Sequence, residues 1–353
     1  MKPWEKNVRK VVPYVPGEQP NKPNMVKLNT NENPYPPAPG VKKALQEMDT
    51  DKLKLYPDPT IKSLVEELAE FYHLQPNQVF VGVGSDDVLA MAFMTFFNSN
   101  KPILFPDITY SFYPVWSELY QIPYETPALN DEFRIVKEDY FRENGGIIIA
   151  NPNAPTSIYE DLSAVEDIVK HSSDVVVIVD EAYIDFAGRS AVELIDSYDN
   201  LLVVQTFSKS RSMAGMRIGY AMGNPTLIKA LQDVKYSFNS YTMNMTSIIA
   251  GVEAVKDRKY FEEGVAKICK TRDKTVEFLR ALGFFVLPSG ANFVFVTHEN
   301  IPAKELFEAL REENIYVRYF NLPRINNYLR ISIGTEEEMN KLLSFLQRFL
   351  KSI

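Results

Sequence analysis

The sequence is poor in the residue types that build covalent cross-links and metal sites. It has one cysteine, Cys269, in 353 residues, which excludes an intrachain disulfide and fits a reducing compartment. Its three histidines, His73, His171 and His298, lie far apart and show no metal-ligand spacing. We therefore expect neither a disulfide nor a metal site.

Long apolar runs and an excess of positive charge are also missing. No run of about 18 apolar residues occurs, and the opening MKPWEKNVRK does not resemble a secretory signal. The formal net charge is -8, which argues against a nucleic-acid surface. We expect a cytoplasmic protein without membrane or nucleic-acid partners.

The apolar residues that are present fall into short, continuous runs. These runs are VFVGVG, PILF, GGIIIAN, DVVVIVD, NLLVVQTF and IGYAMG, with helical patterns between them. Continuous apolar character predicts strands buried on both faces, as in a parallel sheet covered by helices. The sequence thus predicts an α/β fold, with a helix after VFVGVG that Ser85, Asp86 and Asp87 open as N-cap residues.

Composition also divides the chain. Residues 1–40 are rich in proline and asparagine, which rules out one long helix there. We predict that they form an arm that packs on a second domain. Residues 41–255 carry the predicted parallel sheet, and residues 256–353 form a smaller α+β domain that begins with a long helical stretch, EAVKDRKYFEEGVAKICKTRDKTVEFLRALG.

Polar residues follow several predicted strands at the point where each strand ends. They are Ser85 and Asp86, Asn151, Asp180, and Ser208 with Lys209. Ligands of parallel sheets bind beyond the carboxyl ends of the strands. We therefore expect these side chains to converge on one site.

Two of these side chains, Lys209 and Asp180, together with Tyr183, suit a pyridine aldehyde cofactor. Lys209 follows an apolar strand among small residues, and a partly desolvated amine is a nucleophile toward an aldehyde, with which it forms an imine. Asp180 would offset the cost of burying a protonated ring nitrogen, and Tyr183 would donate to the 3-oxygen. The ordinary alternatives are a solvated lysine, a turn cap and a core phenol.

Further groups suit a phosphate. Arg217, eight residues after Lys209, would form a charge-assisted clamp with Thr206, Ser208 and the helix start at Ser85 and Asp86. Tyr110 is either a core residue or a ring that stacks on the cofactor. Together these residues predict a site for pyridoxal phosphate (PLP).

These motifs resemble a known family over nearly the whole chain. The matching segments are VPYVPGE, NTNENPYPPAPG, LYPDPT, VGVGSDD, NPNAPT, VDEAYIDF, TFSKSRSMAGMRIGY and YLRISIG. They are similar to the fold-type-I PLP-dependent aminotransferases and, within them, to the histidinol-phosphate branch. The resemblance implies a large domain with a mostly parallel seven-stranded sheet, a smaller α+β domain, and a homodimer.

The resemblance also implies roles for individual residues. Lys209 would hold the cofactor and shuttle protons, and Tyr56 would reach the cofactor phosphate of the other subunit. Tyr14 and Arg330 would contact the substrate phosphate, and Asn33 and Arg318 would line the same pocket. The implied reaction, in histidine biosynthesis, is transamination between histidinol phosphate and 2-oxoglutarate, with glutamate as product.

The chain departs from the family pattern in two places. Ala154 stands where the family usually has the asparagine that bonds the cofactor 3-oxygen, and we predict Asn153 as its nearest substitute. Arg211 follows the lysine where relatives are often apolar, and we expect it to be a surface charge rather than an extra phosphate contact.

Three other functions share these motifs. One is an aminotransferase for aromatic amino acids, in which Arg330 holds a carboxylate. Another is a PLP-dependent decarboxylase of a phosphorylated amino acid. The third is a PLP-sensing regulator without turnover, although the chain has no room for a DNA-binding domain before its first motif.

Overall fold

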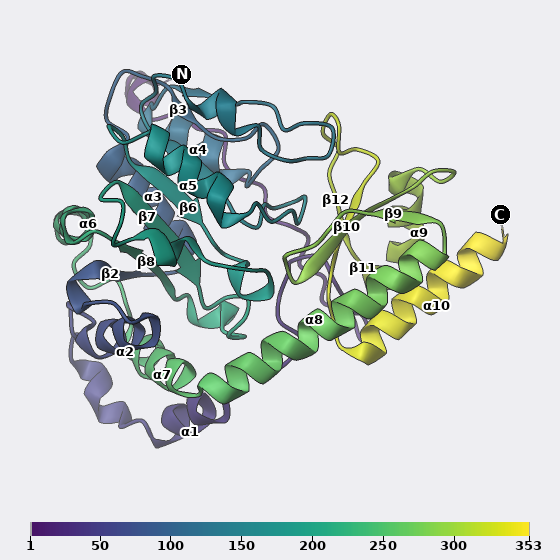
Figure 1. Ribbon diagram of the computed structural model, residues 1–353. Coiled ribbons are helices and arrows are strands. Elements are labelled where there is room, and N and C mark those ends of the chain that lie inside the picture. The colour runs from purple at the N-terminus through teal and green to yellow at the C-terminus, as the bar shows by residue number, and fades with distance from the viewer. Residues whose placement is uncertain (1, 353) are drawn as a thin grey trace.

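The computed structural model describes residues 2–352 and shows two bodies joined along a long helix (Figure 1). The large body is built on a seven-stranded sheet and the small body on a four-stranded one. The joining helix is α8 (Arg258–Ala281). The division that we predict at residues 255 and 256 stays a prediction, and it lies beside the junction of α8 with the preceding helix α7 (Met245–Lys256).

The large sheet is mostly parallel, as predicted. In spatial order its strands are β2 (Val79–Gly82), β8 (Gly219–Gly223), β7 (Leu201–Thr206), β6 (Val177–Asp180), β5 (Ile147–Ala150), β3 (Ile103–Leu104) and β4 (Tyr124–Glu125). Strands β7, β6, β5, β3 and β4 run parallel to one another. Strand β8 is antiparallel to both of its neighbours, β7 and β2. Strand β4 is missing from the prediction because its two residues are exposed and form no apolar run.

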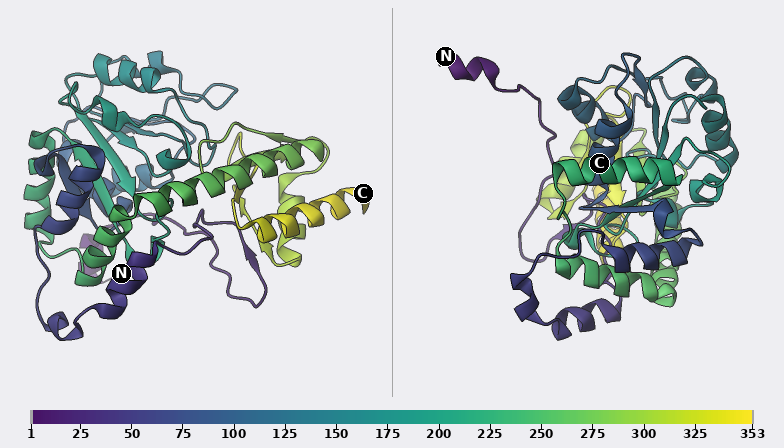
Figure 2. Two further views of the ribbon diagram at one scale, coloured as in Figure 1. Left: turned by 60° about the horizontal axis from the view of Figure 1, so that its bottom comes forward. Right: turned by 90° about the vertical axis from the view of Figure 1, so that its left-hand side faces the viewer.

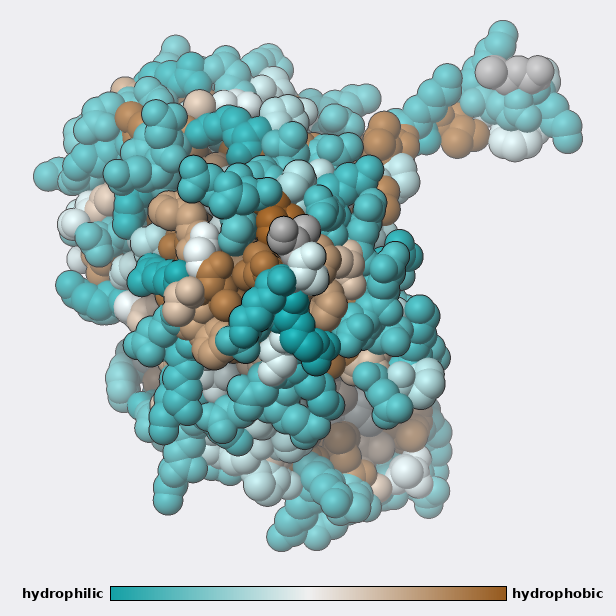
Figure 3. Space-filling model, turned by 90° about the vertical axis from the view of Figure 1, so that its right-hand side faces the viewer, coloured by the Kyte–Doolittle hydropathy of each residue, from teal (hydrophilic) through white to brown (hydrophobic). Residues whose placement is uncertain are grey.

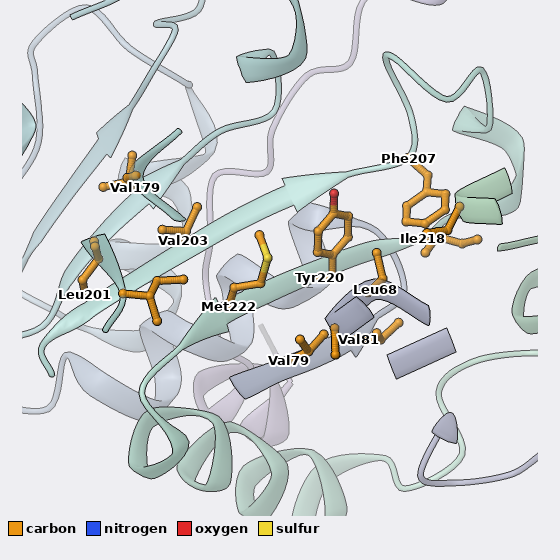
Figure 4. Packing of buried hydrophobic residues seen from close by; sticks show 14 of the residues in the cluster. Leu68, Val79, Val81, Val179, Leu201, Val203, Phe207, Ile218, Tyr220 and Met222 are labelled. Atoms are coloured by element: carbon orange, nitrogen blue, oxygen red, sulfur yellow. The ribbon is translucent and has the colours of Figure 1, made fainter. Parts of the chain in front are cut away.

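Both faces of this sheet are buried, which explains the continuous apolar runs. In β6, Val177 and Val179 point into one hydrophobic cluster and Ile178 into another. Figure 4 shows the first cluster, where Tyr220 of β8 lies near Val81 of β2, and Val203 of β7 lies near Leu201. Helices α2 (Lys62–Tyr72), α5 (Leu162–His171) and α7 cover the first cluster. Helices α3 (Ser85–Phe96), α4 (Phe112–Tyr120) and α6 (Pro225–Phe238) cover the second cluster on the other face of the sheet.

The turn from β2 into α3 differs from the prediction. The N-cap of α3 is Gly84, with φ 87°, and Ser85 is already the first helical residue. The side chain of Asp87 accepts the N–H of Val83 at 2.9 Å instead of capping the helix. The prediction was wrong here because the sharp reversal needs a positive φ, which glycine adopts without steric cost.

The small body has an antiparallel sheet and a second cluster of helices. Its strands, in spatial order, are β12 (Arg318–Tyr319), β13 (Leu329–Ser332), β10 (Phe293–His298) and β9 (Phe284–Val286). Helices α8, α9 (Ala303–Glu312) and α10 (Glu336–Ser352) share one hydrophobic cluster with these strands. This is the α+β order that the sequence predicts.

The long helical stretch predicted to lead into this body is interrupted. Asp257, between α7 and α8, has φ -85° and ψ 67°, which is not helical. Its carboxylate accepts the N–H of Tyr260 at 3.1 Å and so caps α8. The sequence does not predict this interruption because helical periodicity does not reveal a single capping residue.

The N-terminal arm contacts both bodies. Strand β1 (Val26–Lys27) pairs in parallel with β11 (Ile315–Tyr316) of the small body, as an arm packing there requires. Earlier in the arm, however, Tyr14 stacks on Phe112 of α4 in the large body, with ring centroids 4.2 Å apart. The segment around the short helix η1 (Pro3–Asn7) projects away from the molecule (Figures 2 and 3).

Helix α1 (Pro39–Glu47) packs against α7 and is followed by the 3-10 helix η2 (Thr50–Lys54). Further short 3-10 helices are η3 (Pro76–Gln78), η4 (Lys137–Tyr140), η5 (Ile184–Phe186), η6 (Ala191–Leu194) and η7 (Ala214–Met216). Within residues 2–352, no helix has both the length and the apolar character needed to cross a membrane.

Candidate active site

Two adjoining cavities lie where β5, β6 and β7 end. The inner cavity, of about 200 Å³, and the outer cavity, of about 620 Å³, share Thr30, Tyr110, Ala154, Tyr183 and Lys209 as lining. The predicted residues that line the inner cavity are Ser85, Asp86, Tyr110, Asp180, Tyr183, Thr206, Ser208, Lys209 and Arg217. Those that line the outer cavity but not the inner one are Tyr14, Arg318 and Arg330.

Lys209 stands where the two cavities meet. Its Nζ donates to the carbonyl oxygen of Thr30 at 3.3 Å and lies 5.6 Å from the centre of the Tyr183 ring. The side chain of Asn33 donates to the carbonyl oxygens of Lys209 and Ser210, at 3.0 and 3.1 Å. Asn33 therefore fixes the backbone of this turn.

Asp180, the last residue of β6, is a buried carboxylate. The hydroxyl of Tyr113 donates to its Oδ2 at 2.8 Å, and the N–H of Ala182 donates to its Oδ1 at 3.3 Å. Burial raises the pKa of Asp180 to about 6, even though these two donors and the charge of Lys209 act to lower it. Such a carboxylate is poised to accept a cationic partner in the inner cavity.

Tyr183 presents its hydroxyl to the shared wall of the two cavities. That oxygen accepts the side-chain N–H of Asn31 at 2.9 Å, and Asn31 in turn accepts the hydroxyl of Ser332 at 3.0 Å. The ring packs edge-on against Phe293 of β10. The arm, the large body and the small body thus meet at this phenol.

The opposite end of the inner cavity has the form of an anion cradle. A Cβ at Gly84 would lie 2.5 Å from Nη2 of Arg217, and a Cβ at Gly219 would lie 2.2 Å from the backbone of Gly84 and Ser85. The two glycines therefore let β8 and Arg217 approach the N-terminus of α3, whose first amides have no acceptor within the helix. Such a terminus beside a guanidinium suits a phosphate group.

The remaining side chains of the cradle are tied together. Asp86 accepts the hydroxyl of Tyr110 at 2.8 Å and lies 3.3 Å from Nη2 of Arg217. Thr206 donates its hydroxyl to Ser208 at 3.0 Å. Burial, followed by the carboxylate of Asp86, raises the pKa of Tyr110 above its ordinary value, so its hydroxyl remains a donor.

The outer cavity contains two guanidinium groups without a carboxylate partner. Within residues 2–352, neither Arg318 nor Arg330 forms an ion pair, whereas Arg324 in the same wall pairs with Asp107 at 2.7 Å. Arg330 donates to the carbonyl oxygen of Asn29 at 2.9 Å, and its buried Nε has no partner. Burial lowers the pKa of Arg330, which is the electrostatic cost of keeping this cation in the cavity.

Four predicted residues do not line either cavity. Asn151, after β5, instead exchanges hydrogen bonds with the backbone of Glu160, at 3.0 and 2.9 Å. Asn153 is turned away: its amide group bonds Thr109, Ile108 and Thr156, so its contacts do not support it as the substitute for an asparagine at Ala154. Asn33 lies behind Lys209 and does not line the substrate pocket. Tyr56 is 80% exposed on the surface.

Arg211 is the clearest reversal of an expectation. Instead of being a surface charge it is 5% exposed, and its Nη1 donates to the carbonyl oxygen of Ala254 at 2.8 Å. The guanidinium lies 4.7, 5.3 and 4.2 Å from the rings of Phe71, Phe207 and Phe261. Phe71 and Phe261 come from distant segments, so the sequence around Arg211, which contains Phe207 alone of the three, does not reveal this aromatic enclosure.

Two residues of the site were missed by sequence reasoning. Tyr113 and Asn31 bond Asp180 and Tyr183. A weak signal existed for Tyr113, because it follows the predicted Tyr110 by three residues, a spacing that brings side chains together near a helix start. Nothing local distinguished Asn31 from the other asparagines of the arm.

The residues of the inner cavity fit PLP, so fold and site together define a PLP-dependent enzyme. The family model of the aminotransferases of class I and II matches residues 23–346. Histidinol-phosphate aminotransferase 1 of Hydrogenovibrio crunogenus is 53% identical over 349 residues, 99% of this chain and 98% of its own. Histidinol-phosphate aminotransferase of Acinetobacter baylyi is 53% identical over 353 residues, with the same coverage. The chain therefore belongs to the histidinol-phosphate aminotransferases, which confirms the predicted resemblance.

Solved structures agree. Histidinol-phosphate aminotransferase from Sinorhizobium meliloti, in complex with pyridoxal-5'-phosphate, superposes with a TM-score of 0.85 at 25% identity, covering 93% of this chain and 91% of that one. The enzyme from Clostridium acetobutylicum superposes with a TM-score of 0.86 at 24% identity, covering 93% and 100%. These likenesses confirm the predicted fold class.

The glycine contact generates a prediction. Gly219→Ala places a methyl group against the backbone of Gly84 and Ser85, so we expect the cradle to open, PLP affinity to fall by at least roughly tenfold, and thermal stability to drop. Gly215→Ala is the matched control, because nothing lies within 4 Å of a Cβ there. Fluorescence titration of the cofactor-free protein with PLP measures the affinity; equal affinities for the two variants would contradict the predicted contact.

Proposed function

We propose that this chain transfers the amino group of histidinol phosphate to 2-oxoglutarate, with PLP held in the inner cavity and the substrate in the outer one. The observation that carries the proposal is the position of Lys209, which lines both cavities. A group attached to its Nζ can face a bound amine in the outer cavity. The names of the relatives at 53% identity support the choice of substrate.

Each end of the inner cavity suits one part of the cofactor. We assign the phosphate to the cradle formed by Arg217, Thr206, Ser208 and the α3 N-terminus at Ser85 and Asp86. At the other end, Asp180 would keep the ring nitrogen protonated and Tyr183 would donate to the 3-oxygen, while Tyr110 would stack on the ring. When bound, PLP supplies an electron-withdrawing ring that stabilises negative charge on the substrate carbon.

Lys209 would then act twice. Its amine would hold the aldehyde carbon in the resting enzyme, and once displaced by the substrate amine it would move a proton from the substrate carbon. The carbonyl oxygen of Thr30, at 3.3 Å from Nζ, gives the displaced amine a neutral acceptor.

The outer cavity supports an anionic substrate. Arg318 and Arg330 have no carboxylate partner among residues 2–352, and Tyr14 lines the same wall. A phosphate placed there would complete the hydrogen bonds of a buried guanidinium whose Nε lacks an acceptor. The same two cations would bind the carboxylates of glutamate and 2-oxoglutarate in the second half-reaction.

We also propose that the active unit is a homodimer in which Tyr56 completes the partner's site. Tyr56 is 80% exposed, does not line its own chain's cavities, and stacks on Tyr241 with centroids 4.7 Å apart. Leu53 and Leu55, just before Tyr56 in sequence, and Phe238, three residues before Tyr241, are also exposed. Apolar surface of this kind is characteristic of an interface.

The first prediction concerns Lys209. Among residues 2–352, Lys209 is the only lysine that lines both cavities, so we expect Lys209→Ala to lower transamination by at least about a thousandfold. After borohydride treatment, mass spectrometry of the wild-type protein should find the reduced cofactor on the peptide that contains residue 209. Wild-type turnover by the variant, or an adduct on another lysine, would contradict the assignment.

The second prediction concerns substrate class. Arg330→Ala should weaken histidinol phosphate binding by roughly ten- to a hundredfold, since a charge-assisted bond to phosphate contributes about 1.5–3 kcal/mol. Arg348→Ala, which removes an exposed arginine paired with Glu313, is the control.

The same assay separates the alternatives for the wild-type enzyme. Histidinol phosphate should exceed phenylalanine, tyrosine and threonine phosphate as amine donor to 2-oxoglutarate. Preference for phenylalanine would indicate an aromatic aminotransferase, and carbon dioxide release that does not depend on 2-oxoglutarate would indicate a decarboxylase.

The third prediction tests the shared site. We expect Tyr56→Ala and Lys209→Ala proteins each to be weakly active or inactive alone, and to regain activity when they are unfolded and refolded together. A mixed dimer then has one site with both native residues. Failure of mixing to restore activity, although mixed dimers form, would show that Tyr56 does not act across the interface.

A further inference from the structure

Tyr113 is buried at the centre of the large body, on the side of the sheet covered by α3 and α4. Its relative exposure is 0%, and its hydroxyl oxygen lies 2.8 Å from Oδ2 of Asp180. The ring is enclosed by other aromatic rings, namely Phe93, Phe105, Tyr110 and Trp116. The surrounding rings therefore hold the Tyr113 ring in one position, and its hydroxyl has Asp180 as its hydrogen-bond partner.

The carboxylate that it contacts has few other donors. The N–H of Ala182 reaches Oδ1 at 3.3 Å, a longer contact than that of Tyr113. Among charged groups, Lys209 lowers the pKa of Asp180 and Asp86 raises it, and burial outweighs these effects. Loss of the phenol hydrogen bond would leave a buried oxygen without a donor, which disfavours the ionised form.

Tyr113 can act only as a donor in this bond. Burial, followed by the negative charge of Asp180, raises the pKa of its phenol well above the ordinary value. The neighbouring phenols of Tyr110 and Tyr183 are the other titratable groups that face this corner of the inner cavity. The proton between Tyr113 and Asp180 consequently stays on the phenol, and the bond favours the carboxylate.

We infer that Tyr113 is a positioning residue for the reaction: its hydroxyl holds Asp180 ionised and aimed at the ring nitrogen of bound PLP. This inference rests on the proposed function, because it acts through the role assigned to Asp180. When the hydrogen bond is present, the proton shared by Asp180 and the ring resides on the nitrogen. Without it, the proton moves to the carboxylate and the ring withdraws electrons less strongly.

The chain offers a closely matched pair of substitutions. Tyr113→Phe removes the hydroxyl that bonds Asp180. Tyr140→Phe removes a hydroxyl that is equally buried, with 1% relative exposure for the residue, but that has no hydrogen-bond partner among residues 2–352. Both changes keep the ring, so a difference between them reports on the hydrogen bond.

The first measurement uses the cofactor-free protein. Carbon-13 NMR of labelled aspartate carboxyls, with the signal assigned by its loss in Asp180→Asn, follows the titration of Asp180. We expect the midpoint in Tyr113→Phe to rise by about one unit, a tenfold change in proton affinity, and that in Tyr140→Phe to match the wild type. A midpoint unchanged in Tyr113→Phe would overturn the inference.

The second measurement uses the enzyme loaded with PLP labelled with nitrogen-15 in the ring. We expect the wild-type and Tyr140→Phe signals at the position of a protonated ring nitrogen, and the Tyr113→Phe signal displaced toward the unprotonated position. Turnover of Tyr113→Phe should fall by about tenfold, with KM unchanged. If Tyr113→Phe instead has a changed KM, with the turnover and the nitrogen-15 signal of the wild type, the inference is overturned.

Failure of the proposed function gives a different result. A wild-type enzyme whose ring nitrogen is unprotonated would refute the role of Asp180, whereas the carboxyl titration without cofactor still tests Tyr113 by itself. If Tyr113→Phe does not fold, 3-fluorotyrosine at position 113 replaces it. Its more acidic phenol is a stronger donor, so the Asp180 midpoint should fall; a midpoint that rises or stays constant would overturn the inference.

Discussion

One buried carboxylate, at the end of β6, constrains the arrangement of the whole site. Removing a charge from water costs several kcal/mol unless partners compensate for it, and among residues 2–352 Asp180 has two neutral donors, from Tyr113 and Ala182. A cationic ring nitrogen of the proposed cofactor would complete the compensation. The sheet keeps the lysine near this point because Asp180 is paired in register with Val204, from which β7 continues to Thr206 and then to Lys209.

The spacing between Lys209 and Arg217 follows from the same sheet. After Lys209 the chain turns back, and Phe207 bonds Ile218 backbone to backbone where β8 begins its return. Because β8 runs antiparallel to β7, it carries the chain past the N-terminus of α3 at Gly219. The site thus has a negative end at Asp180 and an anion-binding end at α3, with the lysine between the cavities.

The fold and most of the site could be predicted because both depend on local patterns. Continuous apolar runs marked the central strands, and polar residues at their ends marked the inner cavity. The errors concern residues whose neighbours come from distant segments. Arg211 has an ordinary local sequence, yet two of the three phenylalanines that enclose it, Phe71 and Phe261, come from distant elements. Asn153 and Asn33 have side chains that could bind a ligand, but backbone carbonyl oxygens accept the hydrogen bonds of their side-chain amides.

The interruption at Asp257 sets the start of the helix that connects the two bodies. Helix α8 has 24 residues, a rod of about 36 Å at 1.5 Å per residue, with one end beside α7 and the other against β9 of the small body. Between these ends Arg272 donates to the carbonyl oxygen of Phe186 in the large body at 2.9 Å, and Ile268 shares a hydrophobic cluster with Phe186. A single helix is thus tied to both of the bodies whose residues line the outer cavity.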